Sequence, residues 1–165
     1  MTIAQSVNDF LSREQISFDT LQHPPSHSSV QSAIAAQVPL SNIAKAVILK
    51  DSIDNYLMAI IPASNRVQVR RVSKLTDTSV KLATEQEVNS HFRDCQNGAI
   101  PPIGQAYDID IVWDNRLGQV PDIYLEAGDH ETLIHLTQQA FQQIVGDRPH
   151  NDLCSTPEHE TTEDR

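Results

Sequence analysis

The feature that most constrains this chain is the segment from Gly98 to Gly104, which reads Gly-Ala-Ile-Pro-Pro-Ile-Gly. Its two prolines each fix φ at about −65° and each remove a backbone donor. Its flanking glycines can adopt positive φ and allow a ligand to approach the main chain closely. The segment therefore predicts either a rigid loop that walls a small pocket, with its remaining N–H groups directed inward, or a plain connector between two elements.

Short apolar segments of two kinds surround this loop. Apolar residues at helical spacing, with serine and threonine caps, predict helices over 2–14, 30–37, 72–75, 85–92 and 138–145. Runs rich in β-branched residues predict strands over 16–21, 46–49, 56–61, 80–83, 109–113, 123–127 and 132–136. In the second helix we expect Ala33, Ile34 and Val38 on the buried side. Strands that do not alternate regularly with helices predict an α/β or α+β domain with a mixed, strongly curved sheet.

The length of 165 residues suits one domain with a sizeable core, which we place at residues 1–146. Residues 147–165 are polar and acidic, and this composition predicts a disordered tail. No apolar run approaches the ~20 residues that span a bilayer, and the N-terminus lacks the pattern of a secretory signal. We therefore expect a cytoplasmic protein without a membrane partner.

The formal net charge of −10 argues against a non-specific nucleic-acid binder and against a DNA partner. The charge is unevenly distributed, however, because residues 66–81 carry five basic side chains and a single acidic one, Asp77. This segment predicts either a local basic face or an ordinary solvated face.

The cysteines and histidines do not have the spacing of a metal site. No HExxH or paired CxxC motif occurs, so the sequence predicts no metal and no cofactor. His91 and Cys95 stand four positions apart, but a Cys/His hydrolase needs a third, orienting group that the sequence does not place. A buried or capping role is the simpler interpretation of this pair.

Two further features are candidates for chemistry. Lys45 directly precedes an apolar strand, so its side chain is expected at a strand end, where pockets open. A partly desolvated ammonium there can hold a phosphate or stabilise an oxyanion, and the alternative is an ordinary exposed lysine. The turn containing Gly128, Asp129 and His130 joins two strands, where it either orients a substrate or is a tight turn with polar side chains.

Five segments follow one another in a distinctive order. They are His23-Pro24-Pro25 with the helix start at Ser28 and Ser29, Lys45 before its strand, the segment 61–67, the segment 98–104, and the segment 126–130. In this order and spacing they resemble the YbaK/EbsC family of aminoacyl-tRNA deacylase domains, which is also found as the editing insertion of bacterial prolyl-tRNA synthetases. The likeness covers about residues 20–145.

The resemblance implies a compact domain with a curved, mixed, barrel-like sheet, short surrounding helices, and a pocket bounded by the Gly98–Pro102 loop. It implies hydrolysis of the ester that joins a wrong amino acid to the terminal adenosine of a tRNA. Lys45 matches the characteristic lysine of the family, expected near the phosphate and ribose of that adenosine. His130 is a candidate general base or hydrogen-bonding group. We expect the substrate to contact His23, Ser29, Gly98, Ile100, Pro101, Pro102, Ile103, Gly104, Gly128 and Asp129, and the tRNA to contact Arg66, Arg70, Arg71 and Lys74.

These features predict a free-standing deacylase that acts in trans on the acceptor end of a mischarged tRNA, either for proline or for another small amino acid. A synthetase or elongation factor that carries the tRNA is a possible partner. The doubled Pro101-Pro102 and the Asp129-His130 pair depart from the alanine-specific members, so alanine, cysteine, serine and a non-protein amino acid remain open. The alternatives are a non-catalytic module that binds an aminoacyl group, a nucleotide or a protein, and a hydrolase of a small acylated metabolite.

Overall fold

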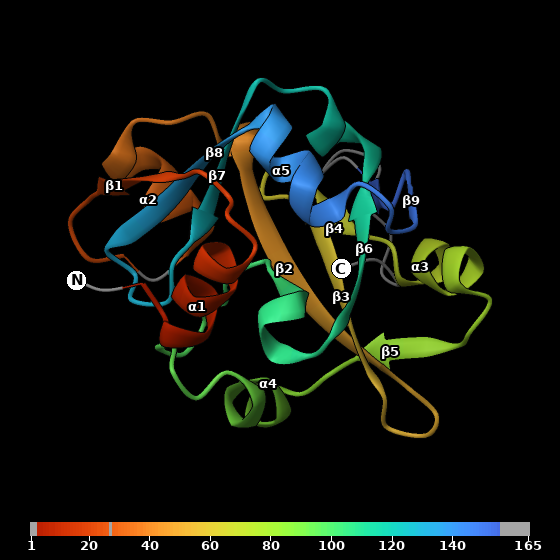
Figure 1. Ribbon diagram of the computed structural model, residues 1–165. Coiled ribbons are helices and arrows are strands. Elements are labelled where there is room, and N and C mark those ends of the chain that lie inside the picture. The colour runs from red at the N-terminus through yellow and green to blue at the C-terminus, as the bar shows by residue number, and fades with distance from the viewer. Residues whose placement is uncertain (1–2, 27, 156–165) are drawn as a thin grey trace.

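The computed structural model describes residues 3–26 and 28–155, apart from the side chain of Val30, and contains one large mixed sheet with helices on both faces (Figure 1). The α-helices are α1 (Gln5–Arg13), α2 (Ser29–Ala36), α3 (Val69–Thr76), α4 (Glu85–His91) and α5 (Gln138–Val145). The 3-10 helices in the described residues are η1 (Leu40–Asn42), η2 (Gly104–Tyr107) and η3 (Asn115–Gly118). The strands are β1 (Asp19–Gln22), β2 (Ile43–Asp51), β3 (Tyr56–Pro62), β4 (Arg66–Val67), β5 (Val80–Leu82), β6 (Asp110–Asp114), β7 (Asp122–Glu126), β8 (Thr132–Thr137), β9 (His150–Asn151) and β10 (Cys154–Ser155).

The large sheet has the strand order β1-β8-β7-β2-β3-β6-β9, with β5 added beside β2. The β2–β3 hairpin is antiparallel, whereas β2 runs parallel to β7 and β3 runs parallel to β6. This confirms the predicted mixed sheet in an α+β domain. The sheet is open, because in the described part of the chain β1 and β9 are its two edges and do not pair with each other. A closed barrel is therefore not formed.

The two faces of the sheet bury different clusters. Ala44, Ala46 and Ile48 of β2 belong to the large core, which also contains the buried residues of α1 and α5. Val47 and Leu49 alternate with them and pack on the opposite face, in a cluster with residues of α3, β4 and β10. We call this opposite side the second face of the sheet.

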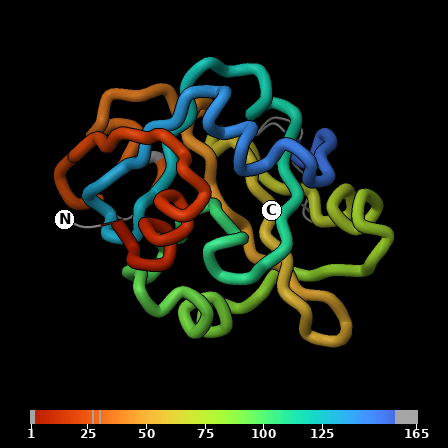
Figure 2. Tube along the Cα trace, viewed as in Figure 1, coloured from red at the N-terminus to blue at the C-terminus, as the bar shows by residue number. Residues whose placement is uncertain are grey.

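Two separate structures cover the second face. At one end α2 packs over Ile43 and Leu133, and at the other end α3, β4 and β10 cover Leu49 and Ile61. The tube in Figure 2 shows α2 and α3 on opposite sides of the molecule, with β2 and β3 between them. Lys45 therefore lies on the second face between two apolar clusters.

Local capping signals are confirmed. Ser28 caps α2 by accepting from the backbone of Gln31, Thr84 and Glu87 form the capping box of α4, and Thr137 caps α5. The prediction that Ile34 is buried is wrong, because Ile34 is 73% exposed. Helix α2 turns Ser32 and Ala33 inward, and one step of about 100° around the helix places Ile34 toward solvent.

The prediction of disorder from residue 147 onward is wrong for residues 147–155. Strand β9 pairs with β6, and β10 pairs with β4. Leu153 is fully buried in the cluster on the second face, and Asp152 forms ion pairs with Arg71 and Arg116. These contacts stabilise a segment whose acidic composition alone favours disorder. The rest of the predicted tail, residues 156–165, lies outside the described residues.

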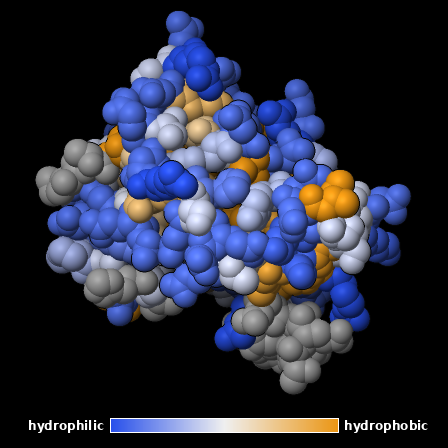
Figure 3. Space-filling view, turned by 90° about the horizontal axis from the view of Figure 1, so that it is seen from below, coloured by the Kyte–Doolittle hydropathy of each residue, from blue (hydrophilic) through white to orange (hydrophobic). Residues whose placement is uncertain are grey.

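The described helices are all short. None of them has the length and the apolar character that crossing a membrane requires. Seen from below, the surface is largely hydrophilic, and its hydrophobic side chains form small separate patches (Figure 3).

Candidate active site

Lys45 and Glu126 occupy equivalent places on neighbouring strands. Strands β2 and β7 are parallel, with Ala44 opposite Leu125, and both of these residues belong to the large core. The next residue on each strand points to the other face, because side chains alternate along a strand. Lys45 and Glu126 therefore both point to the second face. Each comes one residue after a member of the Ala44–Leu125 register pair.

Lys45 is the third residue of β2, which begins at Ile43 and not at Ala46 as predicted, but the side chain has the partly desolvated environment that we expected. Lys45 is partly buried. Burial lowers the pKa of Lys45 below its ordinary value; the nearby Cys154 sulfur opposes this effect, and the Arg66 guanidinium adds to it. A partly desolvated ammonium of this kind interacts more strongly with an anion than a fully hydrated one does.

Glu126 is the centre of a buried polar cluster. Its Oε1 accepts a hydrogen bond of 2.8 Å from Ser32 Oγ, and Ser32 Oγ lies 2.7 Å from Ser26 Oγ. Because the single Ser32 hydrogen goes to Glu126, Ser26 is the donor to Ser32. Burial raises the pKa of Glu126 against the opposing effects of the Ser32 hydroxyl and of His130 and His23. Its second oxygen, Oε2, is buried without a hydrogen-bond partner among the described residues.

His23 is buried near this carboxyl group. It is close enough to act electrostatically on Glu126. Its backbone N–H donates to the Glu131 carbonyl oxygen at 2.9 Å. Its Nδ1 lies 2.8 Å from the Pro24 carbonyl oxygen, and a carbonyl oxygen only accepts, so Nδ1 carries a proton. In the neutral ring Nε2 is then an acceptor, and it is buried without a partner among the described residues.

The β7–β8 turn has the backbone geometry of a tight turn. Gly128 has φ 118° and His130 has φ 62°. The Asp129 carboxylate accepts hydrogen bonds from the backbone of Glu131, and from both the backbone and the hydroxyl of Thr132. The carboxylate predicted to bind substrate thus shapes the turn in which it lies.

The loop from Gly98 is attached to this turn. His130 Nε2 donates to the Asn97 carbonyl oxygen at 2.7 Å, and Gln96 N donates to the Gly128 carbonyl oxygen at 2.8 Å. Gly98 has φ 84°, as its predicted role in the loop requires. A Cβ at Gly98 would lie 3.7 Å from His130 Cε1, so the loop passes directly beside the imidazole.

The second half of the loop packs into the protein. Pro101, Pro102 and Ile103 are buried, Ile103 lies in the large core, and Ile100 packs against that core. A Cβ at Gly104 would lie 2.5 Å from Ile111 Cγ2. Protein atoms therefore fill the space beside Gly104 in which we expected a ligand to approach the main chain. Gly104 is therefore a packing residue, and this half of the loop supports the Gly98 end from the core.

The predicted basic group lies on β4 and α3, and Arg66 of β4 acts electrostatically on Lys45. Arg66, Arg70 and Lys74 are exposed, and Arg71 forms an ion pair of 2.7 Å with Asp152. Ser29 begins α2 and is partly exposed.

The sequence interpretation missed Glu126, Ser26 and Ser32 as members of the site. A signal for Glu126 was present, since it ends an apolar strand and alternates with two core residues, Ile123 and Leu125. In the described part of the chain, no three His, Cys, Asp or Glu side chains come together to hold a metal ion. A groove of ≈ 860 Å³ lies elsewhere, between the β2–β3 hairpin, α3 and β6, and Lys45 does not line it.

Solved structures identify the class of fold. A hypothetical protein, APE2540, is 21% identical, with 92% of this chain and 100% of that chain covered and a TM-score of 0.81. A candidate trans-editing enzyme for prolyl-tRNA synthetase is 18% identical, with 92% and 96% covered and a TM-score of 0.79. A candidate signal transduction protein from Marinobacter aquaeolei is 15% identical, with 90% of this chain and 30% of that chain covered and a TM-score of 0.73. No curated protein matches the sequence.

The family follows from the sequence itself. The model of the aminoacyl-tRNA editing domain family matches residues 23–144, and the chain belongs to this family. The resemblance stated from the sequence is thus confirmed. An editing domain acts on mischarged aminoacyl-tRNA and hydrolyses the ester between the amino acid and the tRNA, so the chain is an aminoacyl-tRNA deacylase.

Proposed function

We propose that this protein acts in trans, as a single editing domain that removes a small, wrongly attached amino acid from tRNA for proline or a similar tRNA. The candidate trans-editing enzyme for prolyl-tRNA synthetase supports this proposal, because the match covers 96% of its chain. The domain would include the segment 147–155, whose strands pair with β6 and β4.

The observation that carries the proposal is the position of Lys45. The partly desolvated ammonium of Lys45 comes one residue after Ala44, which pairs with Leu125 in the large core. It therefore lies on the opposite face of the sheet, which also bears Arg66. In ester hydrolysis water attacks the carbonyl carbon, negative charge develops on the carbonyl oxygen, and the C–O bond to the ribose breaks with a proton passing to the ribose oxygen. Lys45 would stabilise that charge or hold the adjacent phosphate, an effect worth about 3 kcal/mol by comparison with a single oxyanion donor.

His130 would position the loop for this reaction. Its Nε2–H bond to Asn97 and the neighbouring bond from Gln96 to Gly128 keep the Gly98 loop against the β7–β8 turn. The pH–rate profile of a His130→Asn variant distinguishes this positioning role from a role as a general base. Gly98, Gly128, His23 and Ser29 remain the proposed substrate contacts.

Arg66, Arg70 and Lys74 would contact the acceptor end of the tRNA, because all three are exposed on β4 and α3 and Arg66 acts electrostatically on Lys45. A net charge of −10 opposes binding of the whole polyanion, so we propose that a cytoplasmic synthetase or elongation factor presents the tRNA.

Release of labelled amino acid from alanyl-, cysteinyl- and seryl-tRNA for proline tests the function. The wild-type protein is compared with Lys45→Ala and with Lys81→Ala, which removes an exposed lysine of β5. Selective release that is lost only in Lys45→Ala is the expected result. Equal hydrolysis of a free amino-acid ester would favour a hydrolase of small acylated metabolites, and no release from a broad panel would favour a binding module.

A further inference from the structure

We infer that Glu126 and His23 form a binding site for the α-ammonium group of the aminoacyl moiety, and that this site selects substrates with a free α-amine. The inference rests on the proposed function, since it places the aminoacyl ester at Lys45. It concerns a different part of the same substrate.

Two buried atoms of this cluster call for a ligand. Glu126 Oε2 and His23 Nε2 are both buried without a hydrogen-bond partner among the described residues. An ionised carboxylate oxygen accepts, and in the neutral ring of His23, whose Nδ1 carries the single proton, Nε2 accepts as well. Leaving buried acceptors unmatched is costly, so the site calls for a donor. An ammonium group offers three N–H donors, enough for both acceptors.

The strand register places Glu126 close to Lys45. Lys45 and Glu126 follow the Ala44–Leu125 pair on parallel strands and point to the same face, and neighbouring strands are about 4.8 Å apart. The α-nitrogen of an aminoacyl ester is bonded to the carbon next to the carbonyl, so one small aminoacyl group can reach both side chains. The partial negative charge of the ester would lie at Lys45 and the positive amine at Glu126. The reverse orientation would bring like charges together.

The hydrogen bond between Ser32 and Glu126 does not use Oε2. Ser32 Oγ donates to Oε1 alone. In a Glu126→Gln protein the amide oxygen can still accept from Ser32, while the amide NH₂ replaces Oε2. This variant preserves shape and the internal hydrogen bond, and it changes an acceptor into a donor at the proposed contact.

The functional consequence is discrimination against blocked amines. An N-acylated aminoacyl group has lost its positive charge and two of its three N–H donors. Such a site would release a free amino acid from its ester while sparing tRNA that carries a formylated amino acid or a peptide.

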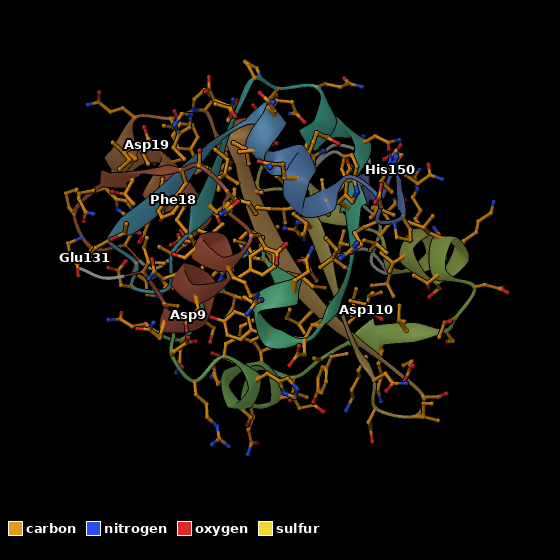
Figure 4. All side chains as sticks on the ribbon, viewed as in Figure 1. Asp9, Phe18, Asp19, Asp110, Glu131 and His150 are labelled. Atoms are coloured by element: carbon orange, nitrogen blue, oxygen red, sulfur yellow. The ribbon has the colours of Figure 1, made fainter. Side chains whose placement is uncertain are left out.

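The test uses 3′-(L-alanylamino)-3′-deoxyadenosine, in which a stable amide replaces the ester, and its N-acetyl derivative. Calorimetric titration of the wild-type protein should show the free amine binding about 10- to 100-fold more tightly than the acetylated compound. Glu126→Gln should abolish this preference without lowering the free energy of unfolding. Glu131→Gln is the matched control, because it removes the same charge from a partly exposed residue of the β7–β8 turn, at the outer edge of the molecule (Figure 4).

Equal wild-type affinity for the two compounds, or binding of neither, would overturn the inference even if the protein releases alanine from tRNA. A preference that survives in Glu126→Gln would overturn it as well. Carboxyl NMR of Glu126 in the wild-type protein needs no variant: the free amine should lower its pKa, and the acetylated compound should not. Failure of the tRNA assay with an intact amine preference would contradict only the proposed action in trans on tRNA for proline or a similar tRNA.

Discussion

Lys45 and Glu126 follow directly after Ala44 and Leu125, a register pair of two parallel strands, and both point away from the large core. The cation faces Cys154 and Arg66, whereas the carboxyl group faces Ser32, His130 and His23. The sheet thus presents two groups of opposite charge between the apolar clusters of its second face.

Lys45→Met should increase the free energy of unfolding and reduce deacylation. Burial lowers the pKa of Lys45, so folding disfavours its charged form at neutral pH, and methionine removes that cost while keeping the length. We expect kcat/KM to fall about 100-fold, from the loss of a single charge-stabilising contact. Urea unfolding and tRNA deacylation measure the two effects. A variant that loses both stability and activity would indicate a structural role.

His130→Asn tests whether the histidine is a base or a positioning residue. Asparagine tolerates the positive φ of 62° but cannot titrate near neutral pH. If the main role of His130 is its hydrogen bond to Asn97, kcat/KM of the variant should fall about 10-fold or more while the pH–rate profile keeps its shape. Loss of the acidic limb of the profile would instead assign His130 as the general base.

His135 should make stability depend on pH. Its Nδ1 and Nε2 each lie 2.7 Å from a carboxylate, Asp19 and Asp122 respectively. Burial lowers the pKa of His135, but the hydrogen bonds to Asp122 and Asp19 outweigh this effect and raise it overall. A raised folded-state pKa stabilises the protein below the unfolded pKa, and this stabilisation is lost as pH rises through the folded pKa.

His135→Gln should therefore cost more stability at pH 5.5 than at pH 9, by about 0.5 kcal/mol, since Asp19 is largely exposed and screened. Urea unfolding at both pH values measures the difference. Asp19→Asn should remove part of the pH dependence. An equal cost of His135→Gln at the two pH values would contradict the assignment.

Gly104→Ala should destabilise the fold by about 1–3 kcal/mol. The new Cβ would lie 2.5 Å from Ile111 Cγ2 and 2.6 Å from the Ile109 carbonyl oxygen, so core atoms must move. Chemical denaturation gives the change in the free energy of unfolding. Unchanged stability would mean that the space beside Gly104 is open, as a role in ligand approach requires.

Leu153→Ala should cost about 2–5 kcal/mol, because Leu153 is fully buried in the cluster on the second face. Its backbone N–H also donates to the buried Asp114 carboxylate at 2.7 Å, which anchors the segment. Asn151→Ala changes an exposed residue of the same segment and should have little effect. Equal, small effects of the two substitutions would place the end of the folded domain at residue 146.

The sequence was sufficient where interactions are local. Ser28, Thr84 and Thr137 cap helices through residues three positions away. Lys45 was found because it stands at the start of an apolar strand and matches a family pattern.

The remaining features depend on contacts between distant segments. The pairing of β2 with β7 joins residues about 80 positions apart, so nothing local links Lys45 to Glu126. Order in the segment 147–155 likewise depends on Asp114 and Arg71, which lie far from it in sequence. The acidic composition of this segment alone therefore predicted disorder. The prediction was wrong because composition does not show which distant residues bind the segment.

The register of β2 against β7 has a consequence for folding. If β2 slipped by one residue, Lys45 would turn into the large core and Ala44 would leave it, and a slip of β7 would do the same to Glu126 and Leu125, because side chains alternate between faces. Burying either ionisable group without its present neighbours costs several kcal/mol. The residues that we assign to substrate binding thus also exclude the nearest wrong pairing of their strands. Neutral, apolar replacements at both positions would remove this penalty and leave the chain freer to misfold.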